Sequence, residues 1–217
     1  MERLRLLVGG PKSEWPESLK NGQLAGPWAA ADRGALDLVK MGFDPILVVG
    51  DFDSIAQNDR EMLQDRLPNV VIKTDEIDTD TKWILNLIQT DIKPETLEIY
   101  GATGGRMDQL LTNLFMFTEP RFREMATRTK LVDRNNVISF YLPGDYTIVQ
   151  EPAMKYLGFV ALEPVEELNL IDEKYPLLHW TGGPKSFESN EFNGKVNHFS
   201  FESGMIAVVQ SKDSSVK

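Results

Sequence analysis

Hydrophobic and polar positions alternate in the first 130 residues in a way that predicts strands separated by helices. Short apolar runs that end at Gly, Pro or Asp are typical of buried strands followed by turns. Such runs span Leu4–Val8, Trp28–Ala31, Ile46–Val49, Val70–Lys73 and Thr96–Tyr100. Helical spacing covers Ala35–Met41, Asn58–Leu67, Thr79–Thr90 and Asp108–Phe117. This alternation predicts βαβ units, a parallel sheet and helices on both of its faces.

The pattern changes after Lys130, where short β-prone segments follow one another with Gly and Pro between them. Regular spacing of this kind predicts a small all-β sandwich or barrel. We therefore expect an N-terminal α/β domain at residues 1–130 and a β-sandwich domain at residues 131–217. The segments are Val137–Leu142, Tyr146–Val149, Tyr156–Ala161, Leu168–Ile171, Leu177–Trp180, His198–Phe201 and Met205–Val209.

Composition and charge exclude several classes of protein. The 217 residues are 41% hydrophobic, enough for a sizeable core, and the 33 acidic against 23 basic residues give a net charge of −10. That balance argues against nucleic acid as a partner. No apolar run approaches the ~20 residues of a membrane helix, and Leu6–Val8 is too short for a signal peptide. Without cysteine, disulfides are excluded, and we expect a cytoplasmic protein with no membrane partner.

Aspartate is concentrated in one part of the chain. Ten of the 16 aspartates lie between Asp32 and Asp80, and two of them, Asp51 and Asp53, directly follow the apolar run Ile46–Val49. Ligands of open α/β sheets bind at the carboxyl ends of strands, and a divalent cation relieves the repulsion between adjacent carboxylates. The pattern favours a metal site, and an Asx-turn with a helix cap is the alternative.

A second acidic cluster spans Asp75–Asp80, before a predicted helix. Asp78 is a natural N-cap there, and Asp80 in the first turn is favoured by the helix dipole. Asp80 also opens onto the same predicted sheet edge as Asp51 and Asp53, and could supply a third carboxylate for Mg²⁺. The helix behind has the spacing of core contacts at Trp83, Ile84, Leu87 and Ile88.

Gly101–Asp108 reads Gly-Ala-Thr-Gly-Gly-Arg-Met-Asp, between a predicted strand and a predicted helix. Glycines let the backbone approach a phosphate, a helix N-terminus offers free N–H groups, and Arg106 supplies bidentate charge. The segment matches neither common glycine-rich nucleotide motif, and its alternative reading is a tight turn capped by Asp108. The only histidines, His179 and His198, lie in the β-rich part and give a histidine-based triad little support.

These loops together favour phosphoryl or pyrophosphoryl transfer assisted by Mg²⁺ held on carboxylates. An aspartyl-phosphate phosphohydrolase with Asp51 as its nucleophile is one alternative, and it would release phosphate without an acceptor. The acceptor is not readable from the loops alone.

The motifs, in their order and spacing, resemble the thiamin pyrophosphokinase family over nearly the whole chain. The resemblance implies transfer of a pyrophosphoryl group from ATP to the hydroxyl of thiamine, giving thiamine diphosphate and AMP with Mg²⁺. It also implies a homodimer, with thiamine bound between the α/β domain of one subunit and the β-sandwich of the other. A second alternative is a non-catalytic thiamine or nucleotide sensor, which would turn nothing over. The matching segments are Ala30–Ala35, Gly50–Ser54, Thr79–Thr81, Gly101–Asp108, Lys174–Leu177 and Ser189–Phe192.

The resemblance also implies roles for individual residues. Its metal-binding acids are Asp51, Asp53 and Asp80, and Asp32 is a further active-site acid. Arg106 and Asp108 contact nucleotide phosphates and order the site, together with the loop residues Thr103, Gly104 and Gly105. Positions that touch thiamine match Glu76 and Asn190, and Phe192 lies near an aromatic that packs on the thiamine ring.

Two positions depart from the family pattern. Gln109 stands where the family often has His, which puts a proton-transfer role of that position in doubt. Ile77 stands where an acid is common, so local metal or substrate contacts differ there.

Overall fold

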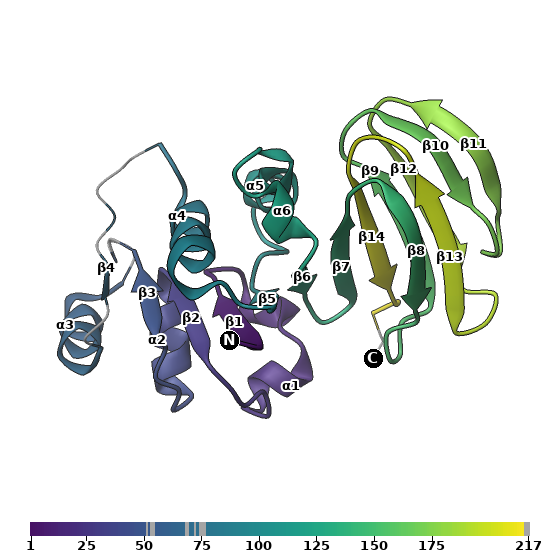
Figure 1. Ribbon diagram of the computed structural model, residues 1–217. Helices are drawn as coiled ribbons and strands as arrows, with labels where there is room; N and C mark the ends of the chain where they lie inside the picture. Colours follow the sequence, from purple (N-terminus) through teal and green to yellow (C-terminus); the bar gives the residue numbers. More distant parts are fainter. Residues whose placement is uncertain (51, 53–54, 68–69, 72, 74–76, 215–217) are drawn as a thin grey trace. The chain divides into compact units, whose positions relative to one another are not determined.

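The computed structural model describes residues 1–50, 52, 55–67, 70–71, 73 and 77–214. It divides the chain into two compact units. The first unit consists of Met1–Met116 and Leu131–Arg134, and the second of Phe117–Lys130 and Asn135–Lys217. The first is a parallel α/β unit and the second is antiparallel β, which confirms the predicted fold class (Figure 1). The domain limits at residues 1–130 and 131–217 stay a prediction.

Parallel strands form the centre of the first unit, in the order β5–β1–β2–β3–β4. Leu4, Leu6 and Leu7 of the central strand β1 are fully buried, as expected for a parallel sheet that is covered on both faces. The strands are β1 (Arg3–Leu7), β2 (Trp28–Ala31), β3 (Leu47–Val49), β4 (Val70–Val71) and β5 (Thr96–Tyr100). Each apolar run predicted as a strand in this unit is confirmed.

Helices lie on both sides of this sheet, and Figure 1 shows α2 and α4 on opposite sides of the strands. Helix α2 packs Ala35, Leu38 and Val39 into one core cluster, whereas α4 buries Ile84 and Leu85 outside that cluster. The elements are η1 (Lys12–Glu14), α1 (Glu17–Lys20), α2 (Arg33–Lys40), α3 (Gln57–Arg66), α4 (Asp80–Leu87), η2 (Ile88–Ile92), α5 (Met107–Phe115) and η3 (Met116–Thr118).

Gly34, in the second position of α2, allows this helix to lie directly on β1. A Cβ atom at Gly34 would stand 2.2 Å from the carbonyl oxygen of Leu7, which no side chain tolerates. The glycine therefore fixes the distance between the helix and the strand, and with it the position of Asp32 just before the helix.

The N-cap of α4 differs from the expected one. Thr79, not Asp78, caps the helix, and its hydroxyl oxygen accepts a hydrogen bond from the Lys82 N–H at 3.3 Å. The helix begins at Asp80, and Thr79, directly before it, has the extended backbone that an N-cap requires. Asp80 lies in the first turn as predicted.

The second unit is a sandwich of two antiparallel sheets, ordered β12–β9–β14–β7 and β11–β10–β13–β8. Phe159 from one sheet and Phe199 from the other meet in its core, with ring centroids 5.2 Å apart. The elements are α6 (Arg123–Ala126), β6 (Thr129–Val132, partly in the first unit), β7 (Asn136–Tyr141), β8 (Gly144–Val149), β9 (Tyr156–Ala161), β10 (Val165–Leu170), β11 (Leu177–Gly182), β12 (Lys185–Glu191), β13 (Val196–Phe201) and β14 (Ile206–Ser211).

Candidate active site

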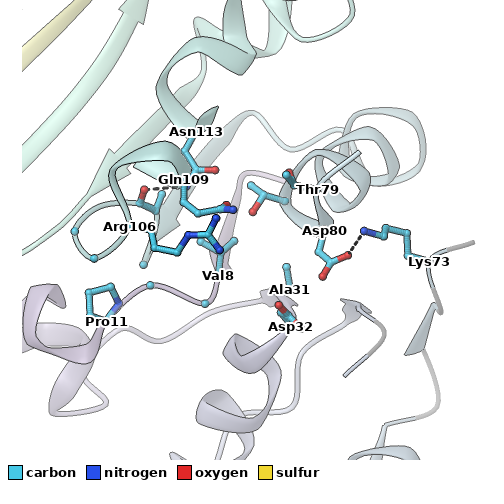
Figure 2. Close-up of a pocket in the computed structure, with 17 residues that line it drawn as sticks. Val8, Pro11, Ala31, Asp32, Lys73, Thr79, Asp80, Arg106, Gln109 and Asn113 are labelled. Carbon is cyan, nitrogen blue, oxygen red and sulfur yellow. Dashed lines mark hydrogen bonds and ion pairs between the residues drawn. The ribbon is translucent and has the colours of Figure 1, made fainter. Parts of the chain in front are cut away.

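The first unit has a cavity of about 590 Å³ where the order of its strands reverses. From β1 the chain moves outward through β2, β3 and β4, and it then returns to β5 on the other side of β1. Ligands of open α/β sheets bind at such a switch point, beyond the carboxyl ends of the strands. The lining residues lie at or after the ends of β1, β2, β4 and β5, at the start of α4 and on α5 (Figure 2).

Two backbone hydrogen bonds join the loops after β1 and β5 where they border the cavity. The Val8 N–H donates to the Tyr100 carbonyl at 3.0 Å, and the Gly10 N–H donates to the Gly101 carbonyl at 2.9 Å. Gly101 has a φ of +72°, and a Cβ there would lie 2.5 Å from the carbonyl oxygen of Val8. The close approach of the two loops therefore requires glycine at position 101.

Asp32 stands at the end of β2 and lines the cavity. Its φ of 55° and ψ of −130° are rare for a residue other than glycine. The backbone is held there by a hydrogen bond from the Asp32 N–H to the Val49 carbonyl at 2.8 Å, and by one from the Ala35 N–H to the Asp32 carbonyl at 3.1 Å. Strain of this kind is concentrated at functional sites, which agrees with the predicted role of Asp32.

Asp80 reaches the cavity from the start of α4 and is paired with Lys73, as Figure 2 shows. The Lys73 Nζ lies 2.9 Å from Asp80 Oδ1, and the two side chains are 16% and 15% exposed. This Asp80 oxygen is buried and receives no aligned hydrogen bond from the described residues, so the attraction of opposite charges holds the pair. The same Nζ donates a hydrogen bond to the Asp78 carbonyl at 2.9 Å.

Arg106 and Gln109 reach the cavity from the opposite side, at the start of α5 (Figure 2). The Arg106 guanidinium binds Asp108 through two hydrogen bonds, with Nε 3.1 Å from Oδ1 and Nη2 2.5 Å from Oδ2. The hydrogen bond from Arg106 lowers the pKa of the Asp108 carboxyl. Asp108 is therefore a carboxylate that orients the arginine, and Arg106 and Gly105 border the cavity together.

In the glycine loop, Gly101–Arg106, the Thr103 side chain points away from the cavity. Thr103 is buried, and its hydroxyl donates to Asp133 Oδ2 at 2.6 Å. The loop is also held from α5, where the Asn113 amide donates to the Ala102 carbonyl at 2.9 Å. Thr103 thus fixes the shape of the loop, while Gly104 and Gly105 form the surface next to the cavity.

Asp51, Asp53 and Glu76 lie outside the described residues. Within the residues that are described, no group of three or more acidic or histidine side chains is close enough together to hold a metal ion. The carboxylates of Asp32 and Asp80 both line the cavity. A three-carboxylate magnesium site therefore stays a prediction.

The two β-domain motifs are joined through Asn190, a buried residue with 4% exposure. Its amide nitrogen donates to the Tyr175 carbonyl at 2.8 Å, and its amide oxygen accepts from the Tyr175 N–H at 2.9 Å. Phe192 is half-buried and packs against the sandwich core. Asn190 thus fixes the loop before β11 and leaves the Tyr175 side chain 58% exposed.

Sequence reasoning missed three contributors to the cavity. These are Lys73, Asn113 and the loop Val8–Pro11. A signal for the loop was present, since its two glycines and a proline follow the first predicted strand. Lys73 and Asn113 carried no comparable signal, because their importance depends on how the backbone brings them to the Asp80 carboxylate and to the Ala102 carbonyl.

Models of two parts of one family match most of the chain. Residues 23–129 match "Thiamin pyrophosphokinase, catalytic domain", and residues 145–206 match "Thiamin pyrophosphokinase, vitamin B1 binding domain". A thiamine pyrophosphokinase of Bacillus subtilis (strain 168) is 30% identical over 223 residues, covering 98% of this chain and 100% of the relative. The chain belongs to the thiamin pyrophosphokinase family.

Solved structures agree with this assignment. A thiamin pyrophosphokinase family protein from Enterococcus faecalis has a TM-score of 0.88 at 38% identity, covering 98% of this chain and all of that one. A protein from Lactobacillus plantarum has the same TM-score at 43% identity, with 99% and 100% of the two chains covered. Membership of the thiamin pyrophosphokinase family makes the chain an enzyme for pyrophosphoryl transfer to thiamine. No helix in the described part of the chain is long and apolar enough to span a membrane.

Proposed function

We propose that this enzyme uses ATP and Mg²⁺ to convert thiamine to thiamine diphosphate and AMP, in the cavity at the switch point of its parallel sheet. The observation that carries the proposal is the position of Asp32, Asp80 and Arg106 around one cavity of about 590 Å³. That volume lies within the range of about 300–1,000 Å³ typical of small-ligand pockets. In the reaction, the thiamine hydroxyl oxygen forms a bond to the β-phosphorus of ATP, and the bond from this phosphorus to AMP breaks.

The nucleotide phosphates bind at the glycine loop and the N-terminus of α5. Gly104, Gly105 and Arg106 border the cavity there, and the helix dipole favours negative charge at that end. Arg106 is 73% exposed, so its guanidinium can turn from Asp108 to a phosphate without losing buried contacts. Asp108 keeps the arginine near the site, and Thr103 keeps the loop in shape.

Asp80, together with Asp51 and Asp53, would hold the metal. The fit of Asp80 is supported by its buried Oδ1 atom, which receives no aligned hydrogen bond within the described part of the chain and already attracts a cationic side chain. Carboxylate oxygens are the ligands that Mg²⁺ prefers. When bound, Mg²⁺ would neutralise the phosphate charge that develops during transfer. Asp32 adds a further negative charge at the same edge of the sheet.

Thiamine carries a positive thiazolium ring, which suits the acidic surroundings of the cavity. We assign Glu76, Asn190 and Phe192 to the thiamine site. Asn190 acts there indirectly, because its amide holds the backbone of Tyr175. Gln109 has an amide that does not titrate, so it positions a ligand rather than accepting the proton of the thiamine hydroxyl.

We also propose a homodimer in which the B1-binding part of one copy approaches the cavity of the other. An apolar stripe on α5 supports it, because this helix also borders the cavity. Met107, Leu111 and Phe115 recur at a spacing of four residues and are 66%, 45% and 41% exposed. A cytoplasmic location accords with substrates that are intracellular metabolites.

The deciding experiment is an assay with ATP, Mg²⁺ and thiamine that measures AMP and thiamine diphosphate together. We expect both products in equal amounts, and no AMP when thiamine is omitted. Asp80→Asn should lower kcat by 100-fold or more while the protein stays folded, and Asp59→Asn, on the exposed helix α3, is the control. Phosphate release without thiamine would instead support the phosphohydrolase, and binding without turnover would support the sensor.

A further inference from the structure

Lys73 has a position that none of the roles above explains. It follows β4, lines the cavity and directs its ammonium group at the carboxylate of Asp80 rather than at solvent (Figure 2). Lysine is seldom buried without a partner, and here only 16% of the side chain is exposed. The proposed metal ligand is therefore matched by an internal cation.

The contacts of the ammonium with Asp78 and Asp80 differ in kind. It donates a hydrogen bond to the Asp78 carbonyl at 2.9 Å, whereas Asp80 Oδ1, at the same distance, receives no aligned hydrogen bond from the described residues. The backbone carbonyl thus anchors the lysine, and the contact with Asp80 is electrostatic. A cation arriving at Asp80 Oδ1 can replace Lys73 there without breaking the anchoring hydrogen bond.

We propose that Lys73 is a built-in counter-cation that competes with the divalent metal for Asp80. In the metal-free enzyme it neutralises a carboxylate that would otherwise be buried and uncompensated. The same charge weakens metal binding, both because it occupies Oδ1 and because it repels a second cation nearby. Lys73 is therefore a positioning residue that keeps Asp80 in place and sets the affinity of the site for metal. The inference rests on the proposed metal role of Asp80.

The test is a titration of the full-length protein with Mn²⁺, without nucleotide, in which electron paramagnetic resonance measures the free ion. The neutral variants Lys73→Met and Lys73→Gln should each bind Mn²⁺ about tenfold more tightly than the wild type. Lys73→Arg, which keeps the charge, should stay within about twofold. Lys40→Met is the matched control, because it breaks another Lys–Asp pair, with Asp59, in the same unit.

Unchanged or weaker Mn²⁺ binding in both neutral variants would overturn the proposal. Mn²⁺ binding by Lys73→Arg that is as tight as that of the neutral variants would overturn it too. Thermal unfolding checks that each variant is folded. Two neutral variants are used so that the test still works if one of them does not fold. The assay for thiamine diphosphate is run on the wild type in parallel. Its failure would reject the proposed function, whereas the Mn²⁺ affinities alone decide the role of Lys73.

Discussion

Single residues in this protein show how a buried charge is handled in two ways. Asp80 is matched by Lys73 at 2.9 Å, whereas Glu173 in the second unit is 3% exposed and has a buried Oε1 atom with no hydrogen bond among the described residues. Burial, with a smaller contribution from the neighbouring charge of Asp172, raises the pKa of the Glu173 carboxyl to about 7. The buried Glu173 carboxyl therefore keeps its proton to a higher pH than an exposed carboxyl does.

Glu173 should make the stability of the protein depend on pH. Its folded pKa lies above the unfolded value, so its contribution is fully present below about pH 4.5 and is lost as the pH rises through 7. Glu173→Gln should therefore raise the free energy of unfolding at pH 8 by about 1–2 kcal/mol and change it little at pH 5. Urea unfolding at both pH values measures this effect.

Glu188→Gln, at an exposed position of β12, is the control for this prediction and should have no effect at either pH. Asp172 and His198 form a pair next to Glu173, with His198 Nδ1 2.7 Å from Asp172 Oδ2, and both residues stay in place in the variant. Equal stability of Glu173→Gln and wild type at pH 8 would show that burial does not raise the pKa of the Glu173 carboxyl in the folded protein.

At the scale of elements, the position of Asp32 depends on how α2 lies on β1. Gly34 allows the contact, because a Cβ there would lie 2.2 Å from the Leu7 carbonyl oxygen. The sequence motif around Asp32 thus combines an acid that faces the cavity with a glycine that packs the helix behind it. One supplies the chemistry, and the other keeps the helix start in place.

Gly34→Ala should destabilise the protein by about 2–4 kcal/mol, because the helix must move away from a packed strand. Gly9→Ala is the matched control, since a Cβ at Gly9 meets no atom within 4 Å. Thermal and urea unfolding of the two variants make the comparison. Equal stability of both would mean that α2 shifts freely on the sheet.

At the scale of the whole molecule, the proposed function gives the two units different parts of one reaction. The cavity with its acids and glycine loop lies in the first unit, and the vitamin B1 binding match lies in the second. The proposed dimer brings the second unit of a partner copy to the cavity. The exposed stripe on α5 is the surface that we expect the partner to cover.

Leu111→Glu should convert a dimer to a monomer, because a charge in the centre of an apolar interface is left without a partner. Thiamine diphosphate formation should fall with the loss of the dimer. Sedimentation velocity of the variant and the wild type measures the assembly. Asn58→Glu, on the exposed face of α3, is the control. A fully active monomeric wild type would contradict the proposal.

The order of strands and helices could be predicted from the sequence, since burial on both sheet faces requires continuous apolar runs and surface helices require periodic ones. Three strands have the predicted bounds, at Trp28–Ala31, Thr96–Tyr100 and Tyr156–Ala161. Strand β12 escaped prediction, because Lys185–Glu191 is mostly polar and gains its place from pairing with β9. Strands with an apolar pattern of their own could be predicted, whereas β12 could not, because its position depends on pairing with β9.

By itself, the sequence determined the fold class, the acidic and glycine loops and the family resemblance, because each depends on residue types at short spacing. Only the tertiary structure decided that Lys73 lies next to Asp80, that the Thr103 hydroxyl binds Asp133, and that Glu173 is buried. These features depend on how the backbone folds around each residue and on which side chains it brings together. Their energies come from distance and burial, which no local pattern encodes.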